Sequence, residues 1–186
     1  ITKTAGLAGW SHTMGLANKP LIIDTEGSGV ALLDFDNDGW MDIYLVNGST
    51  FNALDGKEEP PHAALFHNNH DGTFTDESKE YFKHTSLSSM GQDIEDINND
   101  GLADLVELDM NPPDNYRKKM FMSANNYQAF QNMDRYHYQY QYTRNMVQLN
   151  QGPRVGQNDS IGAPAFSEVS FLTGISQTDW SWCPLL

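Results

Sequence analysis

Short apolar runs alternate with polar turns along most of this chain, and two of the stretches are near copies of each other. Gly29–Leu45 superposes without a gap on the stretch that begins at Gly91. Each copy is a strand-like run, then the pattern D-x-[DN]-x-D-G-x-x-D, then a second apolar run. Self-similarity at a fixed spacing is the sequence signature of a repeat architecture. The chain is therefore predicted to contain two related units.

A weaker similarity follows each copy, in residues 65–76 and 147–169. Both segments hold an apolar run that ends in asparagine, a turn that contains glycine, and another β-compatible run. Short strands separated by glycine, asparagine and aspartate turns favour an all-β fold.

The main exception to the strand pattern is a helical insertion, predicted over residues 112–135. The segment 111–114 suits a helix start, and the Lys, Met, Ala and Gln residues that follow favour helix. Over residues 136–142 tyrosines alternate with polar residues, and a period of two predicts a strand. The tyrosine-rich stretch 127–142 has two interpretations: rings that cover the insertion, or a contact surface for carbohydrate or protein.

Both acidic loops offer side-chain oxygens at alternate positions, as a hard cation requires. Alternate residues of a tight loop can turn toward one centre, and Gly39 and Gly101 permit the sharp turn. Neither loop contains Cys or His, so zinc and copper are disfavoured, and calcium tolerates a flexible oxygen cage better than magnesium does. Two Ca²⁺ sites are therefore predicted, although Asp/Asn turns also form without metal. The predicted ligands are Asp34, Asp36, Asp38, Asp42 and the carbonyl of Trp40 in the loop 34–42, and Asp96, Asn98, Asp100, Asp104 and the carbonyl of Leu102 in the loop 96–104.

An EF-hand is the alternative for the second loop, because Asp96–Glu107 fits its pattern with Glu107 at the twelfth position. The first loop has Leu45 at that position, and Gly91 and Pro112 leave little room for flanking helices. A dockerin-like pair is disfavoured too, since its loops would lie closer together. Loops between strands are the favoured interpretation.

Charge and composition exclude several classes of protein. The 186 residues include 25 acidic and 11 basic side chains, for a net charge of −14, and such a surface repels nucleic acid. Cys183 is the single cysteine; no internal disulfide is possible, and a small buried hydrophobe in an apolar strand is expected. No apolar run approaches the ~20 residues of a membrane span. The opening Ile1-Thr2-Lys3 indicates a mature or truncated product.

The two acidic loops resemble the FG-GAP/VCBS repeats of integrin α-subunit propellers. Bacterial VCBS-repeat proteins related to the ASPIC/UnbV and cartilage acidic protein group are more similar still, over Gly27–Asp34, Leu65–Asp76, Arg144–Asn150 and Thr178–Trp182. The resemblance covers most of the chain. It implies a β-propeller of four-stranded blades with calcium in an inter-strand loop of each blade.

On this basis the chain divides into a first repeat over 1–76, a second over 77–178 and the leading strand of a third over 179–186. Propellers of the family carry about seven blades, so the expected fold class is an all-β, incomplete β-propeller with one helical insertion. An open set of blades exposes strand edges, which proteins pair or cover. The sequence is therefore expected to be a fragment, or to have its edges completed by neighbouring copies.

No set of catalytic residues has a supporting motif such as G-x-S-x-G, so an enzyme is not expected. The six histidines show no metal spacing, and His67 and His70 are expected to be surface turn residues. Residues 47–49 and 158–160 match the N-glycosylation pattern. Ser160 also resembles an O-glycosylation acceptor of some bacterial surface proteins.

The leading hypothesis is a calcium-stabilised repeat module, secreted or on the surface of a bacterial cell, that serves protein interaction, adhesion or self-assembly. Its expected partners are other copies or neighbouring blades. The alternative is a fragment of a larger secreted protein that binds or processes polysaccharide, in which case carbohydrate is the partner.

Overall fold

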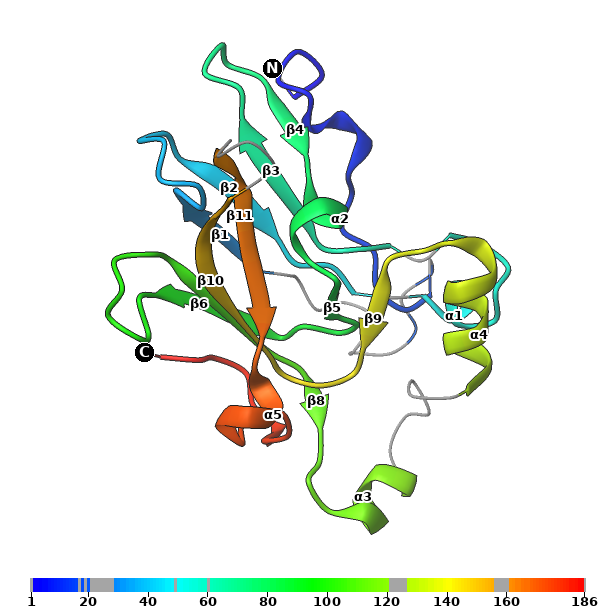
Figure 1. Ribbon diagram of the computed structural model, residues 1–186. Helices are drawn as coiled ribbons and strands as arrows, with labels where there is room; N and C mark the ends of the chain where they lie inside the picture. Colours follow the sequence, from blue (N-terminus) through cyan, green and yellow to red (C-terminus); the bar gives the residue numbers. More distant parts are fainter. Residues whose placement is uncertain are drawn as a thin grey trace.

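The fold is mostly β, with two four-stranded antiparallel sheets at its centre (Figure 1). The computed structural model describes residues 2–16, 18, 20, 29–48, 50–59, 61–120, 127–155 and 161–185. Within this part of the chain neither large sheet closes on itself. No helix there is long and apolar enough to cross a membrane.

The first sheet has its strands in chain order, which are β1 (Val30–Leu33), β2 (Asp42–Leu45), β3 (Ala64–Asn68) and β4 (Phe74–Asp76). Alternation decides which side chains enter the core. Leu33 and Tyr44 are buried, whereas Leu32 is 61% exposed. In this register Leu33 pairs with Asp42 at the end of the sheet where the first acidic loop lies.

The second sheet repeats this topology with β6 (Gly91–Glu95), β7 (Asp104–Leu108), β10 (Met146–Val155) and β11 (Ile161–Glu168). All five residues of β7 are buried, because this strand is central in its sheet and is covered on both faces. The weaker sequence similarity therefore corresponds to the last two strands of each sheet, β3–β4 and β10–β11.

Between β7 and β10 the chain leaves the sheet and forms β8 (Met110–Asn111), α3 (Asn115–Met120), α4 (Tyr127–Tyr136) and β9 (Tyr140–Tyr142). The strand predicted over 136–142 is correct only for its second half. Helix α4 continues through Tyr136 and ends where His137 adopts a φ of 57°. Strand β9 then pairs in parallel with β5 (His84–Ser86), outside the two large sheets.

One hydrophobic core joins the two sheets. Leu33, Phe35 and Tyr44 of the first unit belong to the same buried cluster as Leu105 and Phe166 of the second. Helix α2 (Ser78–Tyr81), which connects the units, adds its buried Tyr81 and the following Phe82 to this cluster. The two repeats therefore share one hydrophobic core and do not pack as independent units.

A buried carboxylate also lies between the sheets. Glu107 of β7 is fully buried, and Tyr44 of β2 donates a 2.7 Å hydrogen bond from its hydroxyl to Oε1. The other oxygen, Oε2, has no hydrogen-bond partner. Burial raises the pKa of Glu107 to about 7, although the hydrogen bond from Tyr44 acts in the opposite direction.

The C-terminal segment follows α5 (Ser170–Thr173) and contains β12 (Asp179–Trp180), which pairs with β8. Beyond β12 the segment runs close to β6. The carbonyl oxygen of Trp182 lies so near Gly91 that a Cβ added to this glycine would be 2.3 Å from it. The prediction that Cys183 is buried in a strand is wrong. This thiol is exposed, since β12 ends at Trp180 and the chain after it lies on the surface.

Candidate metal centre

The two acidic loops occupy the same place in the two sheets. The first joins β1 to β2, with Asp42 as the first residue of β2, and the second joins β6 to β7, with Asp104 as the first residue of β7. Strands flank both loops, so the EF-hand alternative is excluded by the structure. Glu107, its required twelfth residue, is bonded to Tyr44 in the core.

Backbone N–H groups that turn inward hold the first loop in shape. Asp34 accepts hydrogen bonds from the amide of Asp38 to Oδ1 (3.0 Å) and from the amide of Gly39 to Oδ2 (2.9 Å). The amide of Trp40 donates to Asp38 Oδ1 at 2.8 Å. Asn37 and Gly39 have φ values of 61° and 89°, which asparagine and glycine adopt most readily.

The second loop repeats these contacts. Asp96 accepts from the amide of Asp100 to Oδ1 (2.9 Å) and from the amide of Gly101 to Oδ2 (2.8 Å), and the amide of Leu102 donates to Asp100 Oδ1 at 2.9 Å. Asn99 and Gly101 have φ values of 59° and 86°. The sequence similarity thus reflects one loop conformation built twice.

The last aspartate of each loop is buried and anchors neighbouring backbone. Asp42 accepts from the amides of Phe35 (3.1 Å) and Asn68 (2.8 Å). Asp104 accepts in the same way from Ile97 (3.0 Å) and Asn150 (2.8 Å). A carboxylate has about four acceptor positions, so each of these side chains can also bind a cation.

The carboxylates of the first loop crowd one another. One oxygen from each of Asp34, Asp36 and Asp38 lies within 4.8 Å of the others. Burial raises the pKa of Asp36, and the charge of Asp38 raises it further. Burial likewise raises the pKa of Asp42 and of Asp104. A divalent cation would relieve this repulsion, so the donor set fits a hard metal ion.

The second loop carries one carboxylate fewer, because Asn98 stands where the first loop has Asp36. Asn98 Oδ1 accepts from the amide of Asp100 at 3.1 Å, and its Nδ2 donates to Asp100 Oδ2 at 2.9 Å. A cation at the centre of this loop would replace the second of these hydrogen bonds.

A short chain of hydrogen bonds connects the two loops. Asn150, whose amide donates to Asp104, donates from Nδ2 to the carbonyl oxygen of Phe35 at 3.0 Å. Phe35 in turn donates from its amide to Asp42. Asp42 and Asp104, the anchoring aspartates of the two loops, are therefore linked through Asn150 and the backbone of Phe35.

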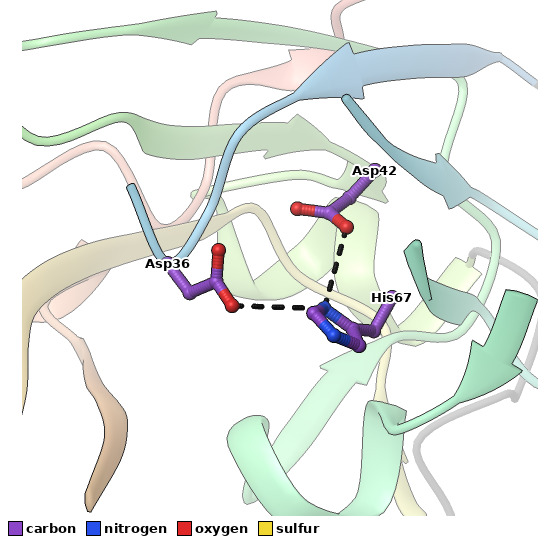
Figure 2. Close-up of side chains that lie close together, drawn as sticks. All are labelled: Asp36, Asp42 and His67. Atoms are coloured by element: carbon purple, nitrogen blue, oxygen red, sulfur yellow. Dashed lines mark ion pairs between the residues drawn. The ribbon is translucent and has the colours of Figure 1, made fainter. Parts of the chain in front are cut away.

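Two histidines that the sequence assigned to a surface turn lie against the first loop. His67 belongs to β3 and is only 22% exposed, and Figure 2 shows its ring between the carboxylates of Asp36 and Asp42. His70 does lie in the turn, where its Nε2 contacts Asp38 Oδ2 and its ring stacks on Trp40. The pairing register of β3 is the information that would have located both histidines beside the loop, because it brings Asn68 to Asp42.

The glycosylation predictions have different outcomes. Ser160 and the rest of residues 158–160 lie outside the described residues. Asn47 is a poor acceptor, because its side chain is 2% exposed and its amide is already bonded. Its Oδ1 accepts from the amide of Thr13, and its Nδ2 donates to the carbonyl of Ser11.

Two antiparallel four-stranded sheets with the same acidic loop at the same strand connection define a β-repeat protein. The family model described as FG-GAP-like repeat matches residues 34–107, which span both loops. The chain therefore contains an FG-GAP-like repeat of the FG-GAP/VCBS type, as its resemblance implied. No curated protein matches the chain significantly.

Proposed function

We propose that this protein is a calcium-stabilised, extracellular interaction module whose two sheets are blades of a propeller-like array. The observation that carries the proposal is the repetition, in both loops, of the same hydrogen bonds around the same pattern of side-chain oxygens. Ligands in each loop are the four side chains at its alternate positions and the carbonyl of Trp40 or Leu102. FG-GAP-like repeats act in protein interaction, and binding rather than catalysis is the role proposed here.

Calcium in this proposal is structural. Each loop joins two strands of a blade, and without metal its carboxylates repel one another at short range. The metal-bound form also fixes the ends of β2 and β7, which are central strands of the two sheets. The free energy of metal binding then adds to the folding stability of the blade.

A calcium titration of the metal-free protein is expected to show two sites of unequal affinity. The loop 34–42 should bind more tightly, because it offers four carboxylates against three, and charge count tunes calcium affinity. Asn98→Asp should strengthen the weaker site by about tenfold, on the order of 1 kcal/mol. Isothermal titration calorimetry measures both effects, with Asn99→Asp, outside the alternate positions, as the matched control. Absence of binding at millimolar calcium would overturn the proposal.

The partner surface proposed is the C-terminal segment. Trp180, Trp182 and Leu185 are 42%, 52% and 93% exposed, and an apolar segment of this size is normally covered. β12 pairs with β8, and the segment passes along the outer edge of β6. A neighbouring blade, either in a longer chain or in a second copy, is the proposed occupant. A contact between unlike surfaces of successive copies would extend indefinitely.

Size-exclusion chromatography with light scattering tests this partner. The 186-residue chain is expected to self-associate in a concentration-dependent way, and Trp182→Ser with Leu185→Ser should abolish association. Calcium binding at both loops should be unchanged, since neither residue is a proposed ligand. Val30→Ser, at a strand position that is 64% exposed in β1, is the control. A monodisperse monomer at all concentrations would contradict self-association.

A further inference from the structure

His67 carries a nitrogen that the fold leaves without a hydrogen bond. Its Nδ1 is shielded from solvent and has no hydrogen-bond partner, although two carboxylates lie within ion-pair distance. The ring is held in place from behind by the fully buried Phe35, in an edge-to-face contact at 5.8 Å between centroids. The imidazole therefore points a fixed, unsatisfied nitrogen toward the acidic loop.

Two carboxylates face this nitrogen from different elements (Figure 2). Nδ1 lies 3.6 Å from Asp36 Oδ2 and 3.5 Å from Asp42 Oδ1, beyond the ~2.7–3.2 Å of an N–H···O hydrogen bond. Ligands that share an ion at ~2.0–2.2 Å and roughly tetrahedral angles are separated by about 3.3–3.6 Å. The spacing matches donors around a common ion and not a direct hydrogen bond.

The second loop lacks this arrangement and so provides an internal comparison. Asn68 and Asn150 donate equivalent backbone hydrogen bonds to Asp42 and Asp104, so the residues before them also correspond. That position is His67 in the first unit and Leu149 in the second.

We propose that Asp36, Asp42 and His67 form a site for a borderline divalent transition-metal ion, with Zn²⁺ as the foremost candidate. Two carboxylate oxygens and one imidazole nitrogen suit Zn²⁺, Co²⁺ and related ions. Calcium prefers oxygen ligands and would not bind the imidazole nitrogen. A water molecule completes the coordination.

This site shares Asp36 and Asp42 with the calcium loop, so Zn²⁺ and Ca²⁺ compete for the first loop only. The inference goes beyond the proposed calcium function and does not depend on it, because the imidazole and the two carboxylates already meet in the metal-free structure. The second loop, with asparagine and leucine at the matching positions, takes calcium alone.

Co²⁺ titration of the metal-free, full-length chain tests the site, because Co²⁺ absorbs visible light when it is bound by nitrogen and oxygen ligands. The unmodified protein is expected to bind one Co²⁺, and Zn²⁺ should displace it. His67→Leu, which installs the residue of the second unit, should weaken binding by more than about 100-fold, since losing a ligand exceeds the 10–100-fold effect of outer-shell partners. His67→Gln should do the same with a polar side chain, and His137→Asn, at an exposed turn, should have no effect.

The reciprocal variant, Leu149→His with Asn98→Asp, should add a second Co²⁺ site at the loop 96–104. Calcium calorimetry on the same samples reports separately on the calcium proposal, and retained calcium binding at the second loop shows that His67→Leu and His67→Gln are folded. Cobalt binding that persists unchanged in both His67 variants would overturn the inference. So would no Co²⁺ binding by the unmodified protein, since His67 would then serve only as an ion-pair partner of the two aspartates.

Discussion

Replacing Asp104 with alanine should lower the free energy of unfolding by about 2–5 kcal/mol even in the presence of a chelator. The side chain is fully buried and accepts hydrogen bonds from the amides of Ile97 and Asn150. Removing it leaves the buried amide of Asn150 and the partly buried amide of Ile97 without a partner, and an unsatisfied buried group costs about 1–3 kcal/mol. Urea denaturation with and without EDTA measures the effect.

Asp100→Ala is the matched control, because it separates the structural role of these loops from metal binding. Asp100 is exposed, and its side chain accepts from the exposed amide of Leu102. With chelator its loss should cost less than about 1 kcal/mol. With calcium the same variant should lose the stabilisation of the native state that the calcium proposal predicts. Equal destabilisation by the two variants in EDTA would show that Asp104 is not an anchor.

The stability of the protein should fall as the pH rises from about 4.5 to about 7, and Glu107 is the largest identified cause. Burial raises the pKa of Glu107 from 4.5 to about 7. In this window the unfolded chain has released the proton while the native state still holds it. Native protein therefore binds more protons, and stability decreases with pH, by on the order of 3 kcal/mol over the window for this group.

The carboxyl groups of Asp109 and Glu168 also affect how the stability depends on pH. Burial raises the pKa of Asp109 to about 6, which adds to the decrease toward neutral pH. Burial also opposes ionisation of Glu168, but hydrogen bonds from His84 and Arg144 outweigh it, so the pKa of Glu168 lies well below its usual range. Glu168 thus stabilises the fold above pH ~4.5, and this contribution is lost on further acidification.

Glu107→Gln should reduce the slope of the profile between pH 4.5 and 7, leaving the smaller decrease due to Asp109, because glutamine stays neutral and can still accept the hydroxyl of Tyr44. Thermal and urea unfolding over this range give the slope, and Glu95→Gln on the exposed face of β6 is the control. A slope that is the same in the unmodified protein and in Glu107→Gln would mean that Glu107 is ionised in the native state.

The sequence predicted the two loops well because their geometry is local. Alternating aspartates and a glycine with positive φ form the turn through hydrogen bonds within a few residues, and that information lies in the motif itself. The positions of β3 and β10 followed from the same repeat. Helix α3 lies within the segment 112–135 where local propensity favours helix, and α4 extends only one residue beyond it.

The errors concern contacts between residues far apart in the chain. The turn residues around His67 predict a surface turn, yet β3 pairs with β2 and carries His67 to Asp42. Tyrosine alternation after residue 135 suggested a strand, but capping at His137 extends α4 over Tyr136. Glu107 fitted a loop motif, and only the packing of two sheets revealed it as a core residue.

The hydrogen bond from Asn150 to the carbonyl of Phe35 has a consequence for how the loops respond to metal. An ion bound by Asp104 would limit the remaining movement of Asn150 and, through Phe35, of the backbone that Asp42 holds. If both loops bind calcium as proposed, the cost of limiting movement in this shared segment would be met once for two binding events, and filling one loop is expected to favour filling the other. Because such coupling is reciprocal, the second loop raises the affinity of the first by the same factor. Under the proposed structural role of calcium, the two loops would therefore stabilise the fold over a narrower range of calcium concentration than independent sites would.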